Sequence, residues 1–250
     1  MPSGLIIVTG GSRGIGAAIC SRLAADGYAV AVNYAANAKA AEATVAEIKK
    51  AGGRAQGFQA DVADSPQLHR LFGQATQALG PLAGLVNNAG VSGRFATTDQ
   101  REAAELTQLF QINVIGTILA CKEAVARLST KHGGSGGSIV NISSIAARTG
   151  GLPGLAPYAA SKGAVESFTK GLATEVGPEG IRVNAVAPGF TDTDMNRDPL
   201  ARAGFRERME AMTPLRRVGA PEEIAEAAAW LISPAAAFVT GSVVTVSGGR

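Results

Sequence analysis

The sequence contains few cysteines, few aromatic residues and little charge. It has 2 cysteines and 2 histidines in 250 residues, with 5% aromatic and 17% charged residues. Cys20 and Cys121 alone cannot stabilise a chain of this length, which argues against a disulfide-built secreted domain. His69 and His132 have no cysteine or carboxylate partners at ligand spacing, so we expect no metal site. A hydrophobic fraction of 46% and a mean hydropathy of +0.15 exclude a disordered chain.

Long apolar runs and clustered charges are also missing. No apolar run approaches the roughly 18 residues that a membrane span needs. Residues 1–9 lack the basic region of a signal peptide. The 23 basic residues nearly balance 20 acidic ones and are scattered along the chain, although the pI is about 9.0. We therefore expect a cytoplasmic protein with no membrane and no nucleic-acid partner.

Small residues are abundant. The chain has 47 alanines and 32 glycines, and glycine exceeds its usual share of about 7%. The glycines have no three-residue period, which excludes collagen. This composition predicts a globular protein with a well-packed core.

Short apolar runs alternate with longer stretches of helical periodicity. The predicted strands span residues 4–9, 29–33, 55–59, 84–87, 138–142, 182–187 and 242–246. The predicted helices span residues 14–26, 39–51, 65–79, 102–129, 158–176 and 221–233. This alternation predicts an α/β fold of the Rossmann type, with a doubly wound parallel sheet of about seven strands and helices on both faces. An eight-unit barrel would need one more strand and helix than the chain contains.

No linker divides the sequence, so we predict a single domain over residues 1–250. The segment 189–217 has no clear strand character and follows the carboxyl end of a predicted strand. Open α/β sheets bind ligands at that edge. We therefore expect this segment to be a substrate lid.

The first predicted strand ends in the sequence Thr-Gly-Gly-Ser-Arg-Gly-Ile-Gly, residues 9–16. Glycines there allow a sharp turn and a close approach to a pyrophosphate, which the helix N-terminus would favour. The spacing of Gly10, Gly14 and Gly16 differs from the usual GxGxxG fingerprint. The position of the turn, rather than its pattern, favours nucleotide binding.

The end of the second predicted strand bears on the choice of dinucleotide. NAD sites usually hold an acid there, whereas this chain has Asn33 and Tyr34. Neither residue would repel a 2′-phosphate, Tyr34 could donate to it, and Arg13 supplies a positive charge. The sequence therefore favours NADP(H) over NAD(H). The alternative is that Arg13 is simply solvated.

Tyr158 and Lys162 lie four residues apart in a predicted helix and so share one face. A nearby cation favours the phenolate and lowers the pKa of a tyrosine. The pair is thus a candidate proton-transfer unit. The same spacing also occurs on ordinary surface helices.

Several motifs occur together and in order. They are Thr9–Gly16, Asn87-Asn88-Ala89-Gly90, Asn141-Ile142-Ser143-Ser144, Tyr158-x-x-x-Lys162 and Pro188-Gly189. Over essentially its whole length the chain resembles the short-chain dehydrogenase/reductase family. It is similar to the 3-oxoacyl-(acyl carrier protein) reductase-like and glucose-dehydrogenase-like members, which are tetrameric NAD(P)-dependent enzymes of the Rossmann fold.

The resemblance implies roles for four residues. Tyr158 would be the general acid/base, and Lys162 would lower its pKa and bind the nicotinamide ribose. Ser144 would hold the substrate oxygen; Ser143 competes for this role, but Ser144 lies nearer the usual separation from the tyrosine. Asn113 would order a water in the proton relay. The alternatives are that the serine caps a turn and that Asn113 bonds its own backbone.

The resemblance also implies the cofactor contacts. Asp61 and Val62 would meet the adenine, although Asp61 and Asp64 are both candidate helix N-caps. Thr191 stands where relatives commonly carry an aliphatic residue, which leaves its exact contact open, although its backbone could still serve. The implied cofactor-binding set is Gly10, Ser12, Arg13, Gly14, Ile15, Gly16, Asn33, Tyr34, Asp61, Val62, Asn88, Ala89, Gly90, Tyr158, Lys162, Pro188, Gly189, Thr191 and Thr193.

The sequence thus predicts an NADP(H)-dependent oxidoreductase that interconverts a carbonyl and a secondary alcohol, with a 3-oxoacyl thioester as one candidate substrate. The alternatives are a sugar or other alcohol dehydrogenase and a catalytically silent NADP(H)-binding sensor. The partners expected are a small-molecule substrate and three further copies of the chain. Selectivity is expected from residues 91–98, 148–157 and 189–217. Arg94 and Arg148 either meet an acidic partner or are solvated.

Overall fold

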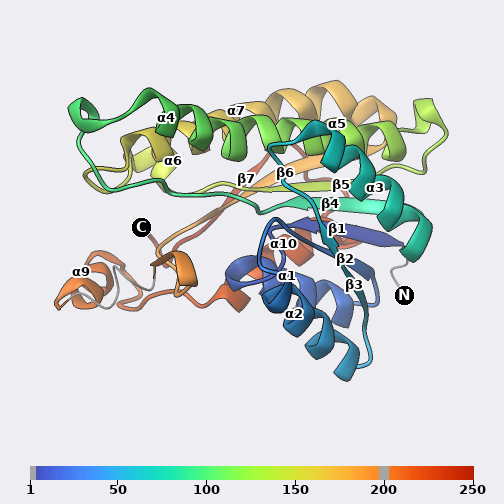
Figure 1. Cartoon of the computed structure of the whole chain (residues 1–250), viewed down its shortest axis with the longest axis horizontal. Helices are drawn as coiled ribbons and strands as arrows, with labels where there is room; N and C mark the ends of the chain where they lie inside the picture. Colours follow the sequence, from blue (N-terminus) through green and yellow to red (C-terminus); the bar gives the residue numbers. More distant parts are fainter. Residues whose placement is uncertain (1–3, 197–202) are drawn as a thin grey trace.

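In the computed structural model, which describes residues 4–196 and 203–250, seven parallel strands form one sheet (Figure 1). The strands are β1 (Leu5–Thr9), β2 (Ala29–Tyr34), β3 (Arg54–Gln59), β4 (Leu82–Asn87), β5 (Gly137–Ile142), β6 (Ile181–Pro188) and β7 (Val243–Val246). Their spatial order is β3-β2-β1-β4-β5-β6-β7. This order confirms the predicted doubly wound topology, and the strand order reverses between β1 and β4.

Helices cover both faces of the sheet. They are α1 (Gly14–Ala25), α2 (Ala38–Lys50), α3 (Ser65–Leu79), α4 (Ala103–Phe110), α5 (Gly116–Leu128), α6 (Ala146–Thr149), α7 (Ala156–Val176), α9 (Phe205–Met212) and α10 (Pro221–Ile232). In Figure 1, α1, α2 and α10 lie below the sheet, and α3, α4, α5 and α7 lie above it. Short 3₁₀ turns complete several connections.

Two hydrophobic cores result from the alternation of side chains along the strands. Ile6 and Val8 of β1 pack in the core that contains residues of α1 and α10. Leu5 and Ile7 pack in the opposite core, beside residues of α3, α5 and α7. All four β1 side chains have no solvent exposure. The first strand is thus an apolar run because it is buried on both faces.

The predicted helix over residues 102–129 contains an irregularity. α4 and α5 are joined by η2 (Gln111–Ile115), a π-helical turn. The combined helix, Ala103–Leu128, is long and apolar enough to cross a membrane by length and composition alone. A core helix passes the same test, and Ala120, Cys121 and Ala124 are buried in the core shared with β4 and β5. We therefore interpret it as a core helix.

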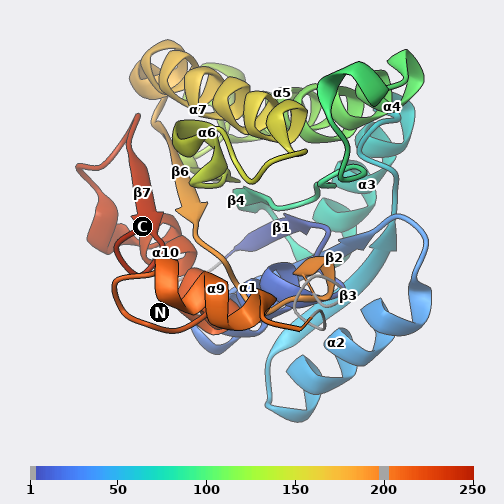
Figure 2. The ribbon, with the colours of Figure 1, turned by 90° about the vertical axis from the view of Figure 1, so that its left-hand side faces the viewer.

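The helix α9 is an addition to the predicted elements. It lies within the segment 189–217, part of which falls outside the described residues. Only Met209 of this helix is buried, so its sequence carries no strong apolar stripe. Figure 2 looks along the sheet from the end where α9 and α6 lie, on opposite sides of it.

Two glycines provide a test of this packing. Gly73 lies within α3, and a Cβ there would meet no atom within 4 Å. We expect Gly73→Ala to raise the free energy of unfolding by about 0.5–1 kcal/mol, because alanine restricts the unfolded chain and favours the helix. Gly16→Ala should instead lower it by about 1–3 kcal/mol, because its Cβ would overlap the backbone of Gly10. Urea unfolding measures both, and equal effects would contradict the packing described.

Candidate functional site

The turn between β1 and α1 requires glycine for its conformation and for its packing. Gly10 and Gly14 have φ angles of +61° and +52°, in the left-handed region. A Cβ at Gly16 would lie 2.2 Å from the carbonyl oxygen of Gly10. Gly16 is therefore a packing residue that lets α1 approach the turn, and it does not line the neighbouring cavity.

The side chains of Asn33 in β2 and of Asn88, the residue that follows β4, hold this turn in place. The Asn88 amide donates to the carbonyl oxygens of Thr9 at 3.1 Å and Gly10 at 2.9 Å. The hydroxyl oxygen of Thr9 accepts from the N–H groups of Asn88 and Ala89. On the other side, the Gly10 N–H donates to Asn33 Oδ1 at 3.3 Å. The turn is thus fixed by both strands that adjoin β1.

A cavity of about 440 Å³ lies beside the turn, at the carboxyl ends of the strands. Every predicted cofactor-binding or catalytic residue lines it except Gly16 and Asn113. Other lining residues are Ala35, Ala36, Asn37, Ala60, Ile112, Ile142 and Ser143, together with Val91, Asp194, Met195 and Asn196 from the segments expected to set selectivity. Most are apolar or lie next to predicted residues, so no chemical signal distinguishes them in the sequence.

Asn33 and Arg13 differ in how free their side chains are. Asn33 is buried, and its amide donates to the carbonyl oxygens of Phe58 at 3.3 Å and Ala60 at 3.0 Å. The polar atoms of the Asn33 side chain are therefore all hydrogen-bonded within the protein. Asn33 forms part of the cavity wall but offers no free donor to a ligand. The exposed Arg13 lines the same cavity, and among the described residues no carboxylate pairs with it.

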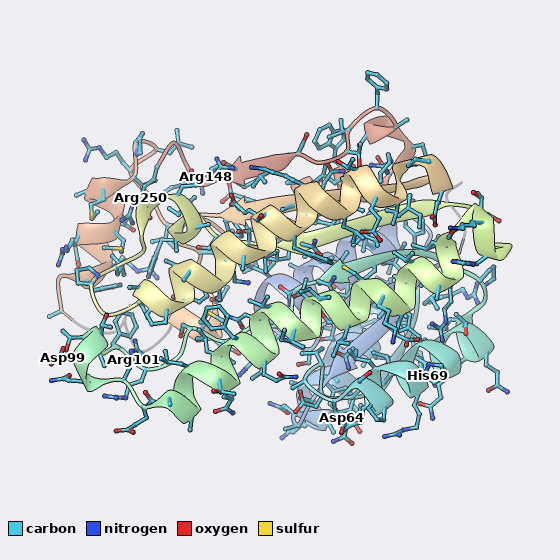
Figure 3. The ribbon with its side chains drawn as sticks, turned by 90° about the horizontal axis from the view of Figure 1, so that it is seen from above. Asp64, His69, Asp99, Arg101, Arg148 and Arg250 are labelled. Atoms are coloured by element: carbon cyan, nitrogen blue, oxygen red, sulfur yellow. The ribbon has the colours of Figure 1, made fainter. Side chains whose placement is uncertain are left out.

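The two acidic residues after β3 have separate roles. Asp64 is the N-cap of α3, because its Oδ1 accepts from the Gln67 N–H at 2.9 Å (Figure 3). Asp61 lines the cavity and accepts from the Ala63 N–H at 2.9 Å. The alternative that Asp61 caps α3 is thereby excluded.

Tyr158, Ser144 and Lys162 meet in the cavity. Burial raises the pKa of Tyr158 above its ordinary value, and a hydrogen bond with Ser144 opposes that rise. The Lys162 Nζ lies 5.9 Å from the centre of the Tyr158 ring and donates to the carbonyl oxygen of Ile142 at 2.8 Å. Lys162 is only 5% exposed, and burial lowers its pKa from the usual 10.5 to about 8. These three side chains can hold and move a proton.

The structure distinguishes the two adjacent serines. The hydroxyl of Ser143 lies 3.1 Å from Glu166 Oε1 and 3.3 Å from the carbonyl oxygen of Lys162. Ser143 is thus engaged with α7. Ser144 instead interacts with Tyr158, and its hydroxyl oxygen also accepts from the Ala146 N–H at 3.1 Å, as in the turn-capping alternative. Arg148 also approaches Glu166, at 3.5 Å, and donates to the Thr245 hydroxyl. Arg148 is therefore not simply solvated.

Asn113 is fully buried behind the cavity, in the π-helical turn η2. Its Oδ1 accepts from the Val91 N–H at 2.8 Å, and its Nδ2 donates to the Val91 carbonyl oxygen and the Ser161 hydroxyl. A Cβ at Gly90 would lie 3.2 Å from Asn113 Oδ1 and 3.5 Å from Lys162 Nζ. The side chain of Asn113 thus positions the Val91 backbone, and its backbone carbonyl oxygen accepts from the Thr117 hydroxyl at 2.9 Å. A role for Asn113 in a proton relay stays a prediction.

The segment after β6 lies over the glycine turn. Thr193 would be in van der Waals contact with a Cβ at Gly14. The hydroxyl of Thr191 donates to the Gly189 carbonyl oxygen, which leaves no free side-chain donor for a ligand. Thr191 also pairs with Gly219 in an isolated parallel bridge. The base of the predicted lid is therefore attached to the segment that leads into α10.

Among the described residues, no group of three histidines, cysteines, aspartates or glutamates could hold a metal ion. Cys20 and Cys121 are both buried and free. The proton-transfer part of the site is thus formed by Ser144, Tyr158 and the buried Lys162, in the same cavity as the glycine turn.

A family model described as enoyl-(acyl carrier protein) reductase matches residues 10–250. The chain is 45% identical to an uncharacterized oxidoreductase of Escherichia coli over 98% of this chain and 99% of the relative. It is 41% identical to a 3-oxoacyl-[acyl-carrier-protein] reductase of Synechocystis over 97% of this chain and 95% of the relative. The chain belongs to the short-chain dehydrogenase/reductase family.

Solved structures agree with this membership. A short-chain dehydrogenase from Burkholderia cenocepacia, crystallised in complex with NADP, matches with a TM-score of 0.90 and 38% identity. The match covers 98% of this chain and 96% of that structure. The chain is therefore an oxidoreductase of the short-chain dehydrogenase/reductase type, as the sequence predicted.

The buried ammonium of Lys162 generates a prediction about stability. Between pH 8 and 10.5 the unfolded chain binds more protons at this residue than the folded chain, so its contribution to stability rises with pH. At pH 7 the folded state retains the full cost of burying the charge. We expect Lys162→Met to raise the free energy of unfolding at pH 7 by about 1–3 kcal/mol.

Urea unfolding of the cofactor-free protein across this pH range measures the effect. Lys170→Met, at an exposed position of the same helix, is the matched control and should change stability little. A destabilised Lys162→Met variant at pH 7 would contradict the prediction.

Proposed function

We propose that the chain is an NADP(H)-dependent oxidoreductase that interconverts a carbonyl compound and a secondary alcohol by hydride transfer. The observation that carries this proposal is the shared cavity. Ser144, Tyr158 and Lys162 line the same cavity as the turn formed by Gly10 and Gly14. A proton-transfer group and a candidate phosphate-binding turn therefore face one ligand space.

The residues at the turn fit a dinucleotide. Gly10 and Gly14 leave the backbone of the turn without side chains, and α1 begins directly after Arg13. A pyrophosphate is favoured at such a helix N-terminus. Arg13, without a carboxylate partner in the described part of the chain, is available to a 2′-phosphate, and Tyr34 lines the same region. These features support NADP(H) over NAD(H).

When bound, NADP(H) supplies or accepts the hydride at the substrate carbon. In the direction of reduction, the Tyr158 hydroxyl donates its proton to the carbonyl oxygen, and the Ser144 hydroxyl donates a hydrogen bond to the same oxygen. The raised pKa of Tyr158 keeps it protonated for this step. The Lys162 ammonium stabilises the phenolate that forms and returns a proton to the Tyr158 oxygen. Alcohol oxidation uses the same groups in reverse.

The substrate of the proposed reaction is a small carbonyl compound or alcohol. The similarity to a 3-oxoacyl-[acyl-carrier-protein] reductase supports a 3-oxoacyl thioester as one candidate. We also propose a cytoplasmic homotetramer. In support of self-association, Trp230 is 41% exposed at the end of α10, and nearby Phe238 is fully exposed.

Replacing the tyrosine tests the reaction. We expect Tyr158→Phe to lower kcat by about 10²–10⁴-fold, because the general acid is lost, with little change in NADPH affinity. The assay is the oxidation of NADPH over a panel of ketones, quinones, sugars and β-ketoacyl thioesters. Tyr28→Phe, at a buried tyrosine that does not line the cavity, is the control. Full activity in Tyr158→Phe would overturn the assigned role. Tight NADPH binding by wild type without any turnover would favour the silent sensor.

Replacing the arginine tests the choice of cofactor. We expect Arg13→Ala to weaken NADP(H) binding by about tenfold or more, because one charge-assisted contact is lost, and to leave NAD(H) binding nearly unchanged. Arg70→Ala removes an equal charge from α3, away from the cavity, and should change neither. Titration with both cofactors measures the difference. A strong preference of wild type for NAD(H) would contradict the proposal.

A further inference from the structure

Two loops extend from the catalytic residues at the carboxyl end of the sheet. The first follows β4 and runs from Val91 to Arg101, and the second, residues 150–155, leads from α6 into α7. Val91 lines the cavity, and Tyr158 lies in the first turn of α7. The two loops therefore adjoin the cavity, one at Val91 and the other through the start of α7.

One carbonyl oxygen joins the two loops. The Gly154 oxygen accepts from Arg101 Nη2 at 2.5 Å and from the Ala96 N–H at 3.3 Å. We call Ala96, Arg101 and Gly154 the loop bridge. Figure 3 shows Arg101 beside Asp99 at the end of the molecule where α4 begins. A bond from a charged donor to a partly buried carbonyl is stronger than a neutral one.

The backbone of the loop bridge is specific to glycine. Gly154 has a φ of +85°, and a Cβ there would lie 3.1 Å from the Ala96 nitrogen. Ala96 and Leu155 are buried on either side of this contact. The close approach of the loops thus depends on the missing side chain at residue 154.

Arg101 holds an unusual position for a cation. Its Nε is buried without a hydrogen-bond partner, and no other buried side-chain nitrogen or oxygen of the described residues lacks one. No carboxylate of the described residues forms a salt bridge with Arg101, unlike the nearby Arg94, which pairs with Glu105 at 3.0 Å. Burying the Arg101 Nε without a partner is unfavourable. The stabilising contact of this side chain is the hydrogen bond from its Nη2 to the Gly154 carbonyl oxygen.

The loop bridge connects to the catalytic helix at both ends. The Leu155 carbonyl oxygen, next to Gly154, accepts from the Ala159 N–H in the first turn of α7. At the other end of the first loop, Asn113 holds Val91 and donates to Ser161, whose hydroxyl donates to the Tyr158 carbonyl oxygen. Both loops are thereby tied to the turn that carries Tyr158.

We propose that Arg101 is a positioning residue that sets the width of the substrate space through the loop bridge. This inference rests on the proposed function and identifies a determinant of substrate size at that site. Loss of the bridge lets the loops separate, which weakens contacts with a small carbonyl substrate and admits bulkier ones. The glycine turn lies on other elements, so cofactor binding is unaffected.

The test compares Arg101→Ala and Arg101→Lys with the matched control Arg94→Ala. We expect Arg101→Ala to raise KM for a small carbonyl substrate about tenfold, with a smaller rise for a bulky analogue and an unchanged Kd for NADPH. Arg101→Lys, which can still donate to Gly154, should restore part of the loss. Arg94→Ala removes an exposed ion pair with Glu105 and a bond to the Gln100 carbonyl oxygen within the first loop, but no contact between the two loops, so it should leave KM nearly unchanged.

Hydrogen exchange gives a readout that does not require turnover. Arg101→Ala should speed exchange at residues 91–100 and 150–155 together, while the strands keep their protection. Unchanged exchange in both loops would overturn the inference, as would a lower melting temperature with unchanged KM and unchanged size preference. If wild type turned over no carbonyl at all, the proposed function would fail, and the exchange result would still decide whether the loop bridge exists.

Discussion

The site depends on a lysine ammonium held almost out of water. Lys162 is anchored by the Ile142 carbonyl oxygen, and burial lowers its pKa to about 8. Removing a charge from water is unfavourable, so the surrounding fold must supply stability to keep it there. The ammonium lies where α7 meets the end of β5. The central sheet thus provides the rigidity with which one side chain is kept in an unfavourable position.

The same region contains the departures from regular structure. Gly90 removes a side chain where Asn113 and Lys162 approach each other. The π-helical turn η2 carries Asn113, whose amide is committed to Val91 and Ser161. Such turns often accompany functional sites. The irregular turn therefore positions the loop beside the cavity, while the regular helix before and after it packs in the core.

Much of the fold could be predicted because local and global signals agree. β1 is apolar because both its faces are buried, and α3 begins after a candidate N-cap residue, Asp64. The helix α9 could not be predicted, because a single buried residue gives it no pattern. For the candidate site, the sequence indicated which residues gather at the cavity. It could not show that the Asn33 amide donates to the carbonyl oxygens of Phe58 and Ala60, since these bonds join segments that lie far apart in the sequence.

The contacts of the loop bridge are the least visible in a sequence. Arg101 and Gly154 are 53 residues apart, and nothing in the composition of either loop points to the other. A glycine in a loop can serve several types of turn, and an arginine on a surface usually requires no specific partner. Chemistry-bearing residues lie at strand ends and helix starts, where topology alone brings them together. The proposed loop bridge instead makes substrate selectivity a matter of how two loops pack, so a chain of this family reveals its chemistry before its substrate.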